Sequence, residues 1–542
     1  MPPNTRALMT VPARDLMAAS VALARSGLVR PYRPDRLLRL GSGLLRYGPG
    51  PGFGPLAGAT FCADTQGIVD DDGTITFGRL EEQCDAVSAG LATLLSPGDR
   101  VGLLARNSAG FYQAMVGAAR CGLDVLYLNT GFSADQIADI VTERGVQALV
   151  HDAEFAAKVP PNVLSIPMTG DAPTSVEQMA ASAGRPGARQ VAAGRAWQPG
   201  PVRRRSRHVM LTSGTTGPPK GVTRTGGAAS SAVALLSGLP NRAEQRCLIA
   251  APMFHGWGWL NAMLTMLLRS TIVVTRRFEP ERLLQLVERE RCQELAAVPT
   301  MLRGIMDLPP DVRRRYDTSS LRAVTLSGSA LPPALADGFM NEFGDILYSF
   351  YGTTEAGYAA VASPADLRTA PGTVGRPLPL VDVRVLGVDG EPSPAGASGM
   401  IWVSSHDTRG HAEKPGEGPD RRRRAVSTGD IGWLDEAGRL FIAGRSDDMI
   451  ITGGENVYPA EVEATLEQHP SVLEAAVVGR RDEVFGQILV AHLTLRDEMK
   501  VTHEQLRSWC RDRLAPFQVP RRFVVHDALP HNEAGKVVKR DL

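Results

Sequence analysis

Short apolar runs alternate with helix-like segments from about residue 58 onward, and this alternation restricts the possible folds more than any other feature of the chain. The runs RVGLLAR (100–106) and LDVLYLN (123–129) are bounded by polar residues, which is typical of buried parallel strands. The segments 75–95 and 134–145 carry apolar residues at helical spacing. Since the alternation resumes from 246 to 333, the sequence predicts the α/β fold class, with a large body of doubly wound subdomains.

The length of the chain, 542 residues, exceeds what one hydrophobic core organises, so two or more domains are expected. Residues 373–444 are rich in turns and strand-like runs, which predicts a small β-rich subdomain. The segments after residue 448 predict a compact, mobile α+β domain. We expect an N-terminal extension at 1–57, a large N-terminal domain at 58–444, a hinge at 445–447 and a C-terminal domain at 448–542.

The charge balance gives no general attraction to polyanions. Lys and Arg number 59 against 58 Asp and Glu, a net charge of +1, so no global field favours nucleic acid. The arginine runs at 203–205 and 421–424 are interpreted as solvated loops, and no nucleic-acid partner is expected. Six cysteines lie scattered without the spacing of metal ligands, which is typical of reduced thiols in a cytoplasmic protein.

The N-terminal extension mixes leucine, valine and alanine with several arginines between residues 16 and 45. No apolar stretch reaches the length of a membrane-spanning helix. Two interpretations stay open: a helix packed on the body of the protein, which is favoured, and an amphipathic helix that touches a membrane surface. The expected location is therefore the cytoplasm, with peripheral membrane contact and a homodimer both left open.

The segment LTSGTTGPPKG, residues 211–221, has the composition of a phosphate-binding loop. Its glycines allow close approach of the backbone, its hydroxyl groups and backbone N–H groups donate hydrogen bonds, and Lys220 supplies positive charge. A Walker A loop needs glycine before the lysine and Ser or Thr after it, whereas here Pro219 precedes Lys220 and Gly221 follows it. The segment predicts a phosphate loop of another kind; the alternative is a surface loop rich in turn residues.

Further motifs follow strand-like runs at 254–255, 327–330 and 351–355. Ligands of open α/β sheets bind outside the carboxyl ends of the strands. We therefore expect these motifs and the phosphate loop to meet in one crevice.

Five motifs occur in order: LTSGTTGPPKG (211–221), YGTTE (351–355), STGD (427–430), GRSDDMIITGGENVYPAEVE (444–463) and LPHNEAGK (529–536). Together they resemble the adenylate-forming enzymes, and most of all the bacterial fatty acyl-CoA synthetases, over the chain from about residue 60. The resemblance implies activation of a medium- or long-chain fatty acid by ATP to acyl-AMP, then transfer of the acyl group to CoA with release of AMP. It implies ATP, Mg²⁺ and CoA as cofactors.

The resemblance also implies a nucleotide site built from separate motifs. The phosphate loop would grip the β- and γ-phosphates of ATP through Thr212, Ser213, Gly214, Thr215, Thr216, Gly217 and Lys220. Tyr351 would stack on adenine, the loop of Gly328, Ser329 and Ala330 would lie at the adenine edge, and Gly352 and Thr353 would bind the nucleotide as part of the same motif as Tyr351. Thr354 would bond the α-phosphate, and Glu355 would hold Mg²⁺, a metal that prefers carboxylate and phosphate oxygens.

The remaining implied roles fall on the domain junction and the C-terminal domain. Asp430 would accept hydrogen bonds from both ribose hydroxyls, Arg445 would contact ribose or phosphate, and Asp447 would be the hinge. Lys536 would bridge carboxylate and α-phosphate oxygens during adenylation; the alternative is a solvated tail lysine. In a second pose the pantetheine tunnel would be lined by Gly453, Gly454 and Glu455.

His255 stands where the resemblance places a histidine near the acyl and thioester end, and a core histidine satisfied by backbone is the alternative. The apolar residues that follow are candidates either for an acyl pocket or for ordinary core: Trp257, Trp259, Leu260, Met263 and 298–302. The length of the acyl chain is not determined by this pattern.

Segment 404–427 departs from the resemblance, because it lacks tyrosine and has few apolar residues where ordered β structure is expected. We interpret it as local divergence, of which a shifted reading frame is one form, since the family pattern resumes at Ser427. Two alternatives to a CoA ligase stay open: an acyl-AMP ligase that loads a carrier protein, and a catalytically impaired homologue that binds nucleotide or acyl ligand.

Overall fold

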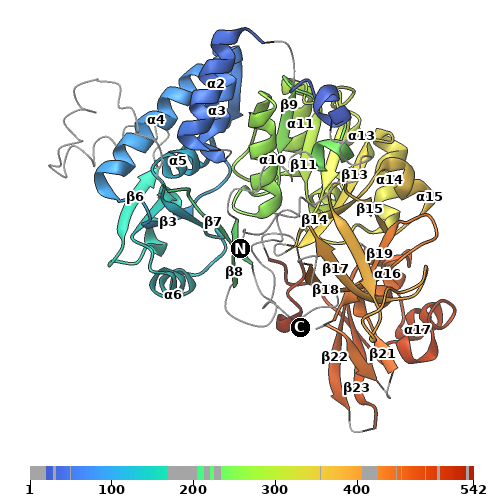
Figure 1. The fold of residues 1–542 in the computed structure, drawn as a ribbon. Coiled ribbons are helices and arrows are strands. Elements are labelled where there is room, and N and C mark those ends of the chain that lie inside the picture. The colour runs from blue at the N-terminus through green and yellow to red at the C-terminus, as the bar shows by residue number, and fades with distance from the viewer. Residues whose placement is uncertain are drawn as a thin grey trace, which may run out of the picture.

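The computed structural model describes residues 20–28, 32–48, 50–168, 204–212, 220–224, 234–353, 356–405, 425–446, 448–452, 455–482, 484–496, 501–532 and 536–542. A large N-terminal body carries one mainly parallel sheet and one mixed sheet, and a smaller sheet domain follows at the C-terminus (Figure 1). This arrangement confirms the predicted α/β class. Within the described ranges no helix is both long enough and apolar enough to cross a membrane.

One sheet of the body has six strands in the order β6-β5-β3-β4-β7-β8, all parallel except for β8, which is antiparallel to β7. Its strands are β3 (Arg100–Leu104), β4 (Asp124–Tyr127), β5 (Ala148–Asp152), β6 (Leu164–Met168), β7 (His208–Thr212) and β8 (Lys220–Arg224). The helices of this part of the chain are α4 (Phe77–Leu94), α5 (Ala109–Arg120) and α6 (Ala134–Arg144). Strand and helix alternate here as the sequence predicted.

The second sheet has thirteen strands in the order β16-β17-β18-β19-β15-β14-β13-β12-β11-β9-β10-β1-β2. Its parallel part holds β1 (Gln66–Asp70), β9 (Arg246–Ile249), β10 (Thr271–Val273), β11 (Glu294–Ala297), β12 (Ala323–Leu326) and β13 (Leu347–Thr353). The helices between these strands are α10 (Gly256–Leu267), α11 (Pro280–Glu290), α12 (Pro299–Met306), α13 (Pro310–Arg313) and α14 (Pro333–Phe343).

The antiparallel part of this sheet extends the parallel part instead of forming a sheet of its own. It holds β2 (Gly73–Thr76), β14 (Gly357–Ala362), β15 (Thr373–Pro377), β16 (Asp382–Leu386), β17 (Gly399–Ser404), β18 (Val426–Leu434) and β19 (Leu440–Arg445), with α15 (Pro364–Thr369) between β14 and β15. The β-rich character expected for 373–444 therefore appears as strands added to one edge of the α/β sheet.

The C-terminal part has its own apolar core, which includes Val462, Leu466, Val477, Leu493 and Phe523. Its elements are β20 (Ile450–Thr452), β21 (Glu455–Val457), α16 (Pro459–Glu467), β22 (Val472–Asp482), β23 (Gly486–Leu495), α17 (His503–Arg511) and β24 (Arg522–Val525). This core is separate from the core of the body. The C-terminal domain could therefore rotate relative to the body without any change in the packing of its own interior.

The N-terminal helices α2 (Pro34–Tyr47) and α3 (Gly54–Cys62) are tied to the body by Arg120, whose side chain is fully buried. Its guanidinium lies 2.6 Å from carboxylate oxygens of both Glu81 and Asp85, and its Nε donates to the carbonyl of Gly52 at 3.0 Å. The ring of Tyr47 lies 4.4 Å from the same guanidinium. The end of α2 is thus held by a paired and hydrogen-bonded buried charge.

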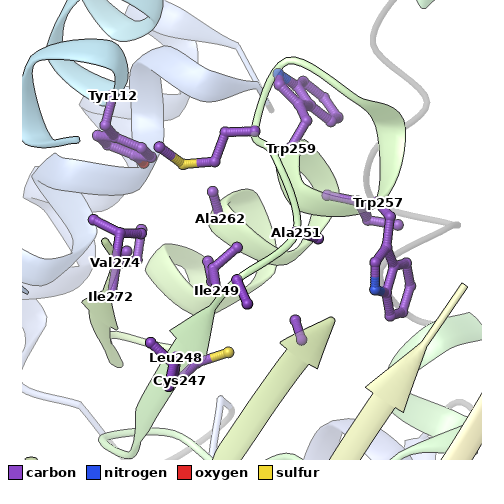
Figure 2. Close-up of a cluster of buried hydrophobic side chains, with 14 of the residues drawn as sticks. Tyr112, Cys247, Leu248, Ile249, Ala251, Trp257, Trp259, Ala262, Ile272 and Val274 are labelled. Carbon is purple, nitrogen blue, oxygen red and sulfur yellow. The ribbon is translucent and has the colours of Figure 1, made fainter. Parts of the chain in front are cut away.

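The central core gathers apolar side chains from several elements, as Figure 2 shows for Tyr112 of α5, Leu248 and Ile249 of β9, and Trp257 and Trp259 of α10. Residues 298–302, candidates from the sequence for an acyl pocket or ordinary core, are the N-cap and the first four residues of helix α12. Pro299 occupies the first turn of that helix, where the missing N–H of proline has no intrahelical partner to lose.

Glu294 lies at the start of β11 with its side chain buried in this core. Nδ2 of Asn241 donates a hydrogen bond to its Oε2 at 2.8 Å. Burial raises the pKa of the Glu294 carboxyl to about 8. In the unfolded chain the pKa of a glutamate carboxyl is about 4.3. Between about pH 4.3 and pH 8, Glu294 is therefore protonated in the folded state and ionised in the unfolded state.

Glu294→Gln should flatten the pH dependence of stability. For the wild type the free energy of unfolding should fall as pH rises from about 4.3 to about 8, by roughly 1.4 kcal/mol per pH unit at most, because the folded state binds the extra proton. Glutamine keeps an acceptor for Asn241 and cannot titrate. Urea midpoints at pH 5, 6, 7 and 8 measure this slope, with exposed Glu436→Gln as the control. Equal slopes for the wild type and Glu294→Gln would contradict the assignment.

Candidate active site

Strands β11, β12 and β13 are parallel neighbours, so the segments after their carboxyl ends lie side by side. Gly328, in the loop after β12, has a φ of 99°, a left-handed conformation that favours glycine. Ser329 is half-buried and Ala330 is exposed in the same loop. Tyr351, Gly352 and Thr353 form the half-buried end of β13. The expected adenine-binding segments therefore share one edge of the sheet, as the sequence predicted.

Tyr351 and Asp430 contact each other directly, although 79 residues separate them. The Tyr351 hydroxyl donates to Oδ2 of Asp430 at 2.6 Å. The other carboxylate oxygen lies 3.6 Å from a guanidinium nitrogen of Arg445. Burial raises the pKa of the Tyr351 hydroxyl, and the negative charge of Asp430 raises it further, so tyrosine stays a hydrogen-bond donor to a carboxylate.

The position of Asp430 follows from the pairing of β18 with β19, in which Asp430 stands opposite Arg445. The backbone N–H of Asp430 donates to Oγ1 of Thr428 at 3.1 Å, and Arg445 donates to the Thr428 carbonyl at 3.3 Å. Gly429 has a φ of 74°, and a Cβ there would lie 3.1 Å from the guanidinium of Arg445. Glycine at this position therefore lets carboxylate and guanidinium approach each other.

Lys536 comes from the C-terminal domain and lies near the same group of residues. Two hydrogen bonds link its backbone to Asn532: the N–H of Asn532 donates to the Lys536 carbonyl, and the N–H of Lys536 donates to Oδ1 of Asn532, each at 2.9 Å. The side chain keeps contact with solvent, but the protein packed around it lowers the pKa of its ammonium. The negative charge of Asp430 acts to raise the pKa of Lys536, and the positive charge of Arg445 acts to lower it. The charged groups of the body therefore act on a lysine of the C-terminal domain.

His255 lies at the start of α10, and its backbone carbonyl accepts from the N–H of Trp259 at 3.0 Å. Burial lowers the pKa of its imidazole to about 4, and the positive charge of Lys536 lowers it in the same direction. The Nε2 atom is buried and has no hydrogen-bond partner among the described residues. The neutral form of the His255 imidazole is therefore favoured, and one of its ring nitrogens lacks the partner that a buried polar atom usually has.

The two tryptophans after His255 have different surroundings, and their indoles point to different sides of the helix start (Figure 2). Trp259 donates from Nε1 to the hydroxyl of Tyr127 at 2.9 Å, and Tyr127 in turn contacts His208 at 2.8 Å, so Trp259 belongs to a buried network of the core. Trp257 packs against Phe350 at 5.2 Å and Tyr358 at 5.4 Å between ring centroids. Trp257 therefore stands beside the end of β13 that carries Tyr351.

The two domains contact each other in this arrangement through an ion pair. Arg303 of α12 lies 3.9 Å from a carboxylate oxygen of Glu467 at the end of α16. Burial raises the pKa of the Glu467 carboxyl to about 7, and Arg303 acts in the opposite direction. Tyr458, just before α16, also lies close to Gly444 of β19. These contacts hold the C-terminal domain where Lys536 meets the body.

Several expected site residues lie outside the described residues: Ser213, Gly214, Thr215, Thr216, Gly217, Thr354, Glu355, Asp447, Gly453 and Gly454. Thr212 and Lys220 are the paired ends of β7 and β8, on either side of the phosphate loop. Glu455 is exposed at the start of β21. Most of segment 404–427 also lies outside the description, but the strands that flank it pair with each other, with Val403 opposite Val426.

Two contacts of this site were not foreseen from the sequence: the hydrogen bond from Tyr351 to Asp430, and the ion pair between Arg303 and Glu467. Each motif was assigned a ligand separately, and no pattern in the sequence couples one motif with another. For Arg303 and Glu467 the sequence carries no signal, because both look like ordinary surface charges on helices.

Tyr351→Phe tests the contact between tyrosine and carboxylate. Losing the hydroxyl removes a charge-assisted hydrogen bond, so the Asp430 carboxylate loses its fixed orientation. We expect the KM for ATP to rise roughly 10-fold with a smaller change in kcat, since such bonds contribute about 1.5 kcal/mol or more. Tyr348→Phe, on the same strand and half-buried, is the matched control. An unchanged KM in Tyr351→Phe would show that the hydrogen bond does not position Asp430.

Comparison with known proteins covers most of the chain. Residues 57–409 match the family model described as AMP-binding enzyme, and residues 461–536 match the AMP-binding enzyme C-terminal domain. A feruloyl-CoA synthase of Amycolatopsis sp is 30% identical over 86% of this chain and 93% of its own length. The long-chain-fatty-acid–CoA ligase FadD13 of Mycobacterium tuberculosis is 29% identical over 85% of this chain and 90% of its own.

A solved structure shows the same architecture. It is the O-succinylbenzoate coenzyme A synthetase of Bacillus subtilis in complex with ATP and magnesium ion. It is 27% identical to this chain, covers 90% of it and 98% of its own chain, and aligns with a TM-score of 0.74.

Proposed function

The chain belongs to the AMP-binding enzyme family, as an adenylate-forming ligase of the acyl- or aryl-CoA class, and from this premise we propose that its acid is a medium- or long-chain fatty acid. The reaction has two halves: the carboxylate attacks the α-phosphate of ATP and releases pyrophosphate, and the thiol of CoA then attacks the acyl-adenylate and releases AMP. The observation that carries the ligase chemistry is the pair of Asp430 and Arg445 in the body, which acts electrostatically on Lys536 of the C-terminal domain, as Lys536 acts on His255.

In the first half, Lys536 stabilises the negative charge that builds between the carboxylate and the α-phosphate. Its compact ammonium is suited to bridging two oxygens, and the crowded surroundings strengthen that interaction relative to water. Asp430 accepts the ribose hydroxyls, with Tyr351 and Arg445 fixing its orientation. Because the pKa of His255 is lowered to about 4, its imidazole is neutral at pH 7 and adds no positive charge that would repel Lys536.

The other proposed roles follow the motifs. The phosphate loop holds the β- and γ-phosphates, Thr354 bonds the α-phosphate, and Glu355 holds Mg²⁺, which supplies charge neutralisation on the phosphates when bound. Asp447 is the hinge about which the C-terminal domain turns to bring Gly453, Gly454 and Glu455 to the pantetheine arm of CoA. The separate core of the C-terminal domain supports such a rotation.

The nature of the acid rests on the apolar side of the site. Trp257, Phe350 and Tyr358 pack ring against ring beside Tyr351, and these three residues offer an acid no cation to pair with a second carboxylate. An uncharged chain behind the reacting carboxylate fits such a wall by burial of apolar surface. FadD13 is named for long-chain fatty acids, and the Amycolatopsis enzyme is named for an aromatic acid. The experiment that tests the proposal therefore compares these two classes of acid as substrates.

The substrate test measures pyrophosphate release with ATP, Mg²⁺ and straight-chain fatty acids of graded length, alongside ferulate and O-succinylbenzoate, with and without CoA. We expect turnover with medium or long chains only when CoA is present, with AMP and acyl-CoA accumulating. Preference for ferulate or O-succinylbenzoate would contradict the fatty-acid proposal and leave the ligase class intact. Acyl-AMP formation that CoA does not discharge would indicate a carrier protein as acceptor, and no release with any acid would indicate an impaired homologue.

Lys536→Ala tests the role of the ammonium. We expect acyl-AMP formation to slow by about 10²–10³-fold, the range for loss of one donor to a developing anion. Thioester formation from supplied acyl-AMP and CoA should change little, because that half uses the second pose. Lys539→Ala is the matched control, since Lys539 pairs with Glu463 at 2.7 Å within the C-terminal domain. Equal loss in both half-reactions would contradict the assignment of Lys536 to adenylation.

A further inference from the structure

Helix α2 turns its apolar side toward solvent. It is amphipathic, and four of its leucines are exposed: Leu37 by 50%, Leu38 by 74%, Leu44 by 45% and Leu45 by 88%. The apolar side of a surface helix normally faces the core. Here the only fully buried position of the helix is Gly43. The exposed leucines form a surface that the rest of the described protein does not cover.

The orientation of α2 is fixed from its other side. Gly43 packs so closely on Leu56 of α3 that a Cβ at residue 43 would collide with the leucine side chain. Tyr47, one turn later, lies over the buried guanidinium of Arg120. At roughly 100° per residue, Leu38 and Leu45 point about 140–160° away from Gly43. The helix cannot turn these leucines inward without losing the contacts of Gly43 and Tyr47.

Positive charge lies on the other side of α2, within about 60° of Gly43 at roughly 100° per residue. Arg36, Arg39 and Arg46 lie on α2 and Arg33 caps it, whereas Asp35 is the one acidic residue of the helix and pairs with Arg33 at 3.1 Å. Arg39 is exposed, and Arg36 lies over the ring of Phe61, 5.6 Å from its centroid. Leucines on one side of a helix and arginines on the other are the pattern of a helix that lies in the plane of a membrane interface.

We propose that α2 docks on a lipid bilayer rich in anionic headgroups, with Leu37, Leu38, Leu44 and Leu45 entering the interface and the positive charge of the exposed Arg39 attracted to the anionic surface. A second copy of this chain fits the surface less well. One helix of 14 residues, about 21 Å long and 10 Å wide, offers far less than the roughly 800 Å² per partner of a standard interface.

The position of α2 in the fold is compatible with docking. It lies at the end of the N-terminal body away from the C-terminal domain, whose strands β22 and β23 are at the opposite side of the molecule (Figure 1). Membrane contact through α2 would leave the C-terminal domain free to rotate. The docking rests on the geometry of α2 and does not depend on which acid the enzyme activates.

The experiment is co-sedimentation of the full chain with vesicles of phosphatidylcholine alone and of phosphatidylcholine mixed equally with phosphatidylglycerol. The wild type should partition to the mixed vesicles, and Leu38→Glu/Leu45→Glu should reduce the partition coefficient by ~10-fold or more, since two buried leucines and two added charges both act against insertion. Arg39→Gln should weaken binding to mixed vesicles more than to phosphatidylcholine. The control is Val388→Glu/Val484→Glu, which makes the same charge change at exposed valines elsewhere.

Melting temperatures within a few degrees of the wild type establish that the variants fold, as expected for exposed positions. Absence of wild-type binding to the mixed vesicles overturns the proposal, and so does equal loss of binding in the leucine variant and the valine control. Sedimentation velocity without lipid provides the other decisive result. A wild-type dimer that becomes monomeric only in Leu38→Glu/Leu45→Glu, together with no vesicle binding, would assign the surface to a second copy.

Discussion

The electrostatic influence of the Asp430 carboxylate and the Arg445 guanidinium on the Lys536 ammonium, across the junction of two domains, is the interaction on which the proposed site depends. The body alone holds the carboxylate and the guanidinium, and the C-terminal domain alone holds the ammonium. A site with all three charges exists only while the domains are docked, and Arg303 and Glu467 form an ion pair across that docked interface. Chemistry and domain position are therefore coupled by the same few charged groups.

The described contacts that position the Asp430 carboxylate come from neighbouring strands of the sheet and not from the divergent segment 404–427. Asp430 is held by its pairing with Arg445, by Thr428 and by the hydroxyl of Tyr351. The strands on both sides of the divergent segment pair with each other, so β18 has a partner strand before the STGD motif begins. The local divergence thus leaves the described supports of Asp430 in place, which favours a working site over an impaired one.

Much of the fold could be predicted, because parallel strands buried on both faces and amphipathic helices leave periodic patterns in the sequence. The contacts inside the site could not. The hydrogen bond from Tyr351 to Asp430 joins two motifs that were each assigned to a ligand, and Trp259, a candidate for the acyl pocket, donates instead to Tyr127 of the core. Motifs identify which residues are chemically suited to bind a ligand. Contacts between residues of different motifs depend on the order of the strands in the sheet, which local sequence patterns do not reveal.

The sequence by itself determined the α/β class, the family and the chemical type of the residues at each motif, since these follow from local pattern and composition. Only the tertiary structure decided which side of α2 faces solvent, which imidazole has its pKa lowered by burial and which charged groups of the body act on Lys536. The physical reason is that burial and electrostatic fields are sums over neighbours in space. The neighbours that shift the pKa values of His255 and Lys536 include residues from segments far away in the chain.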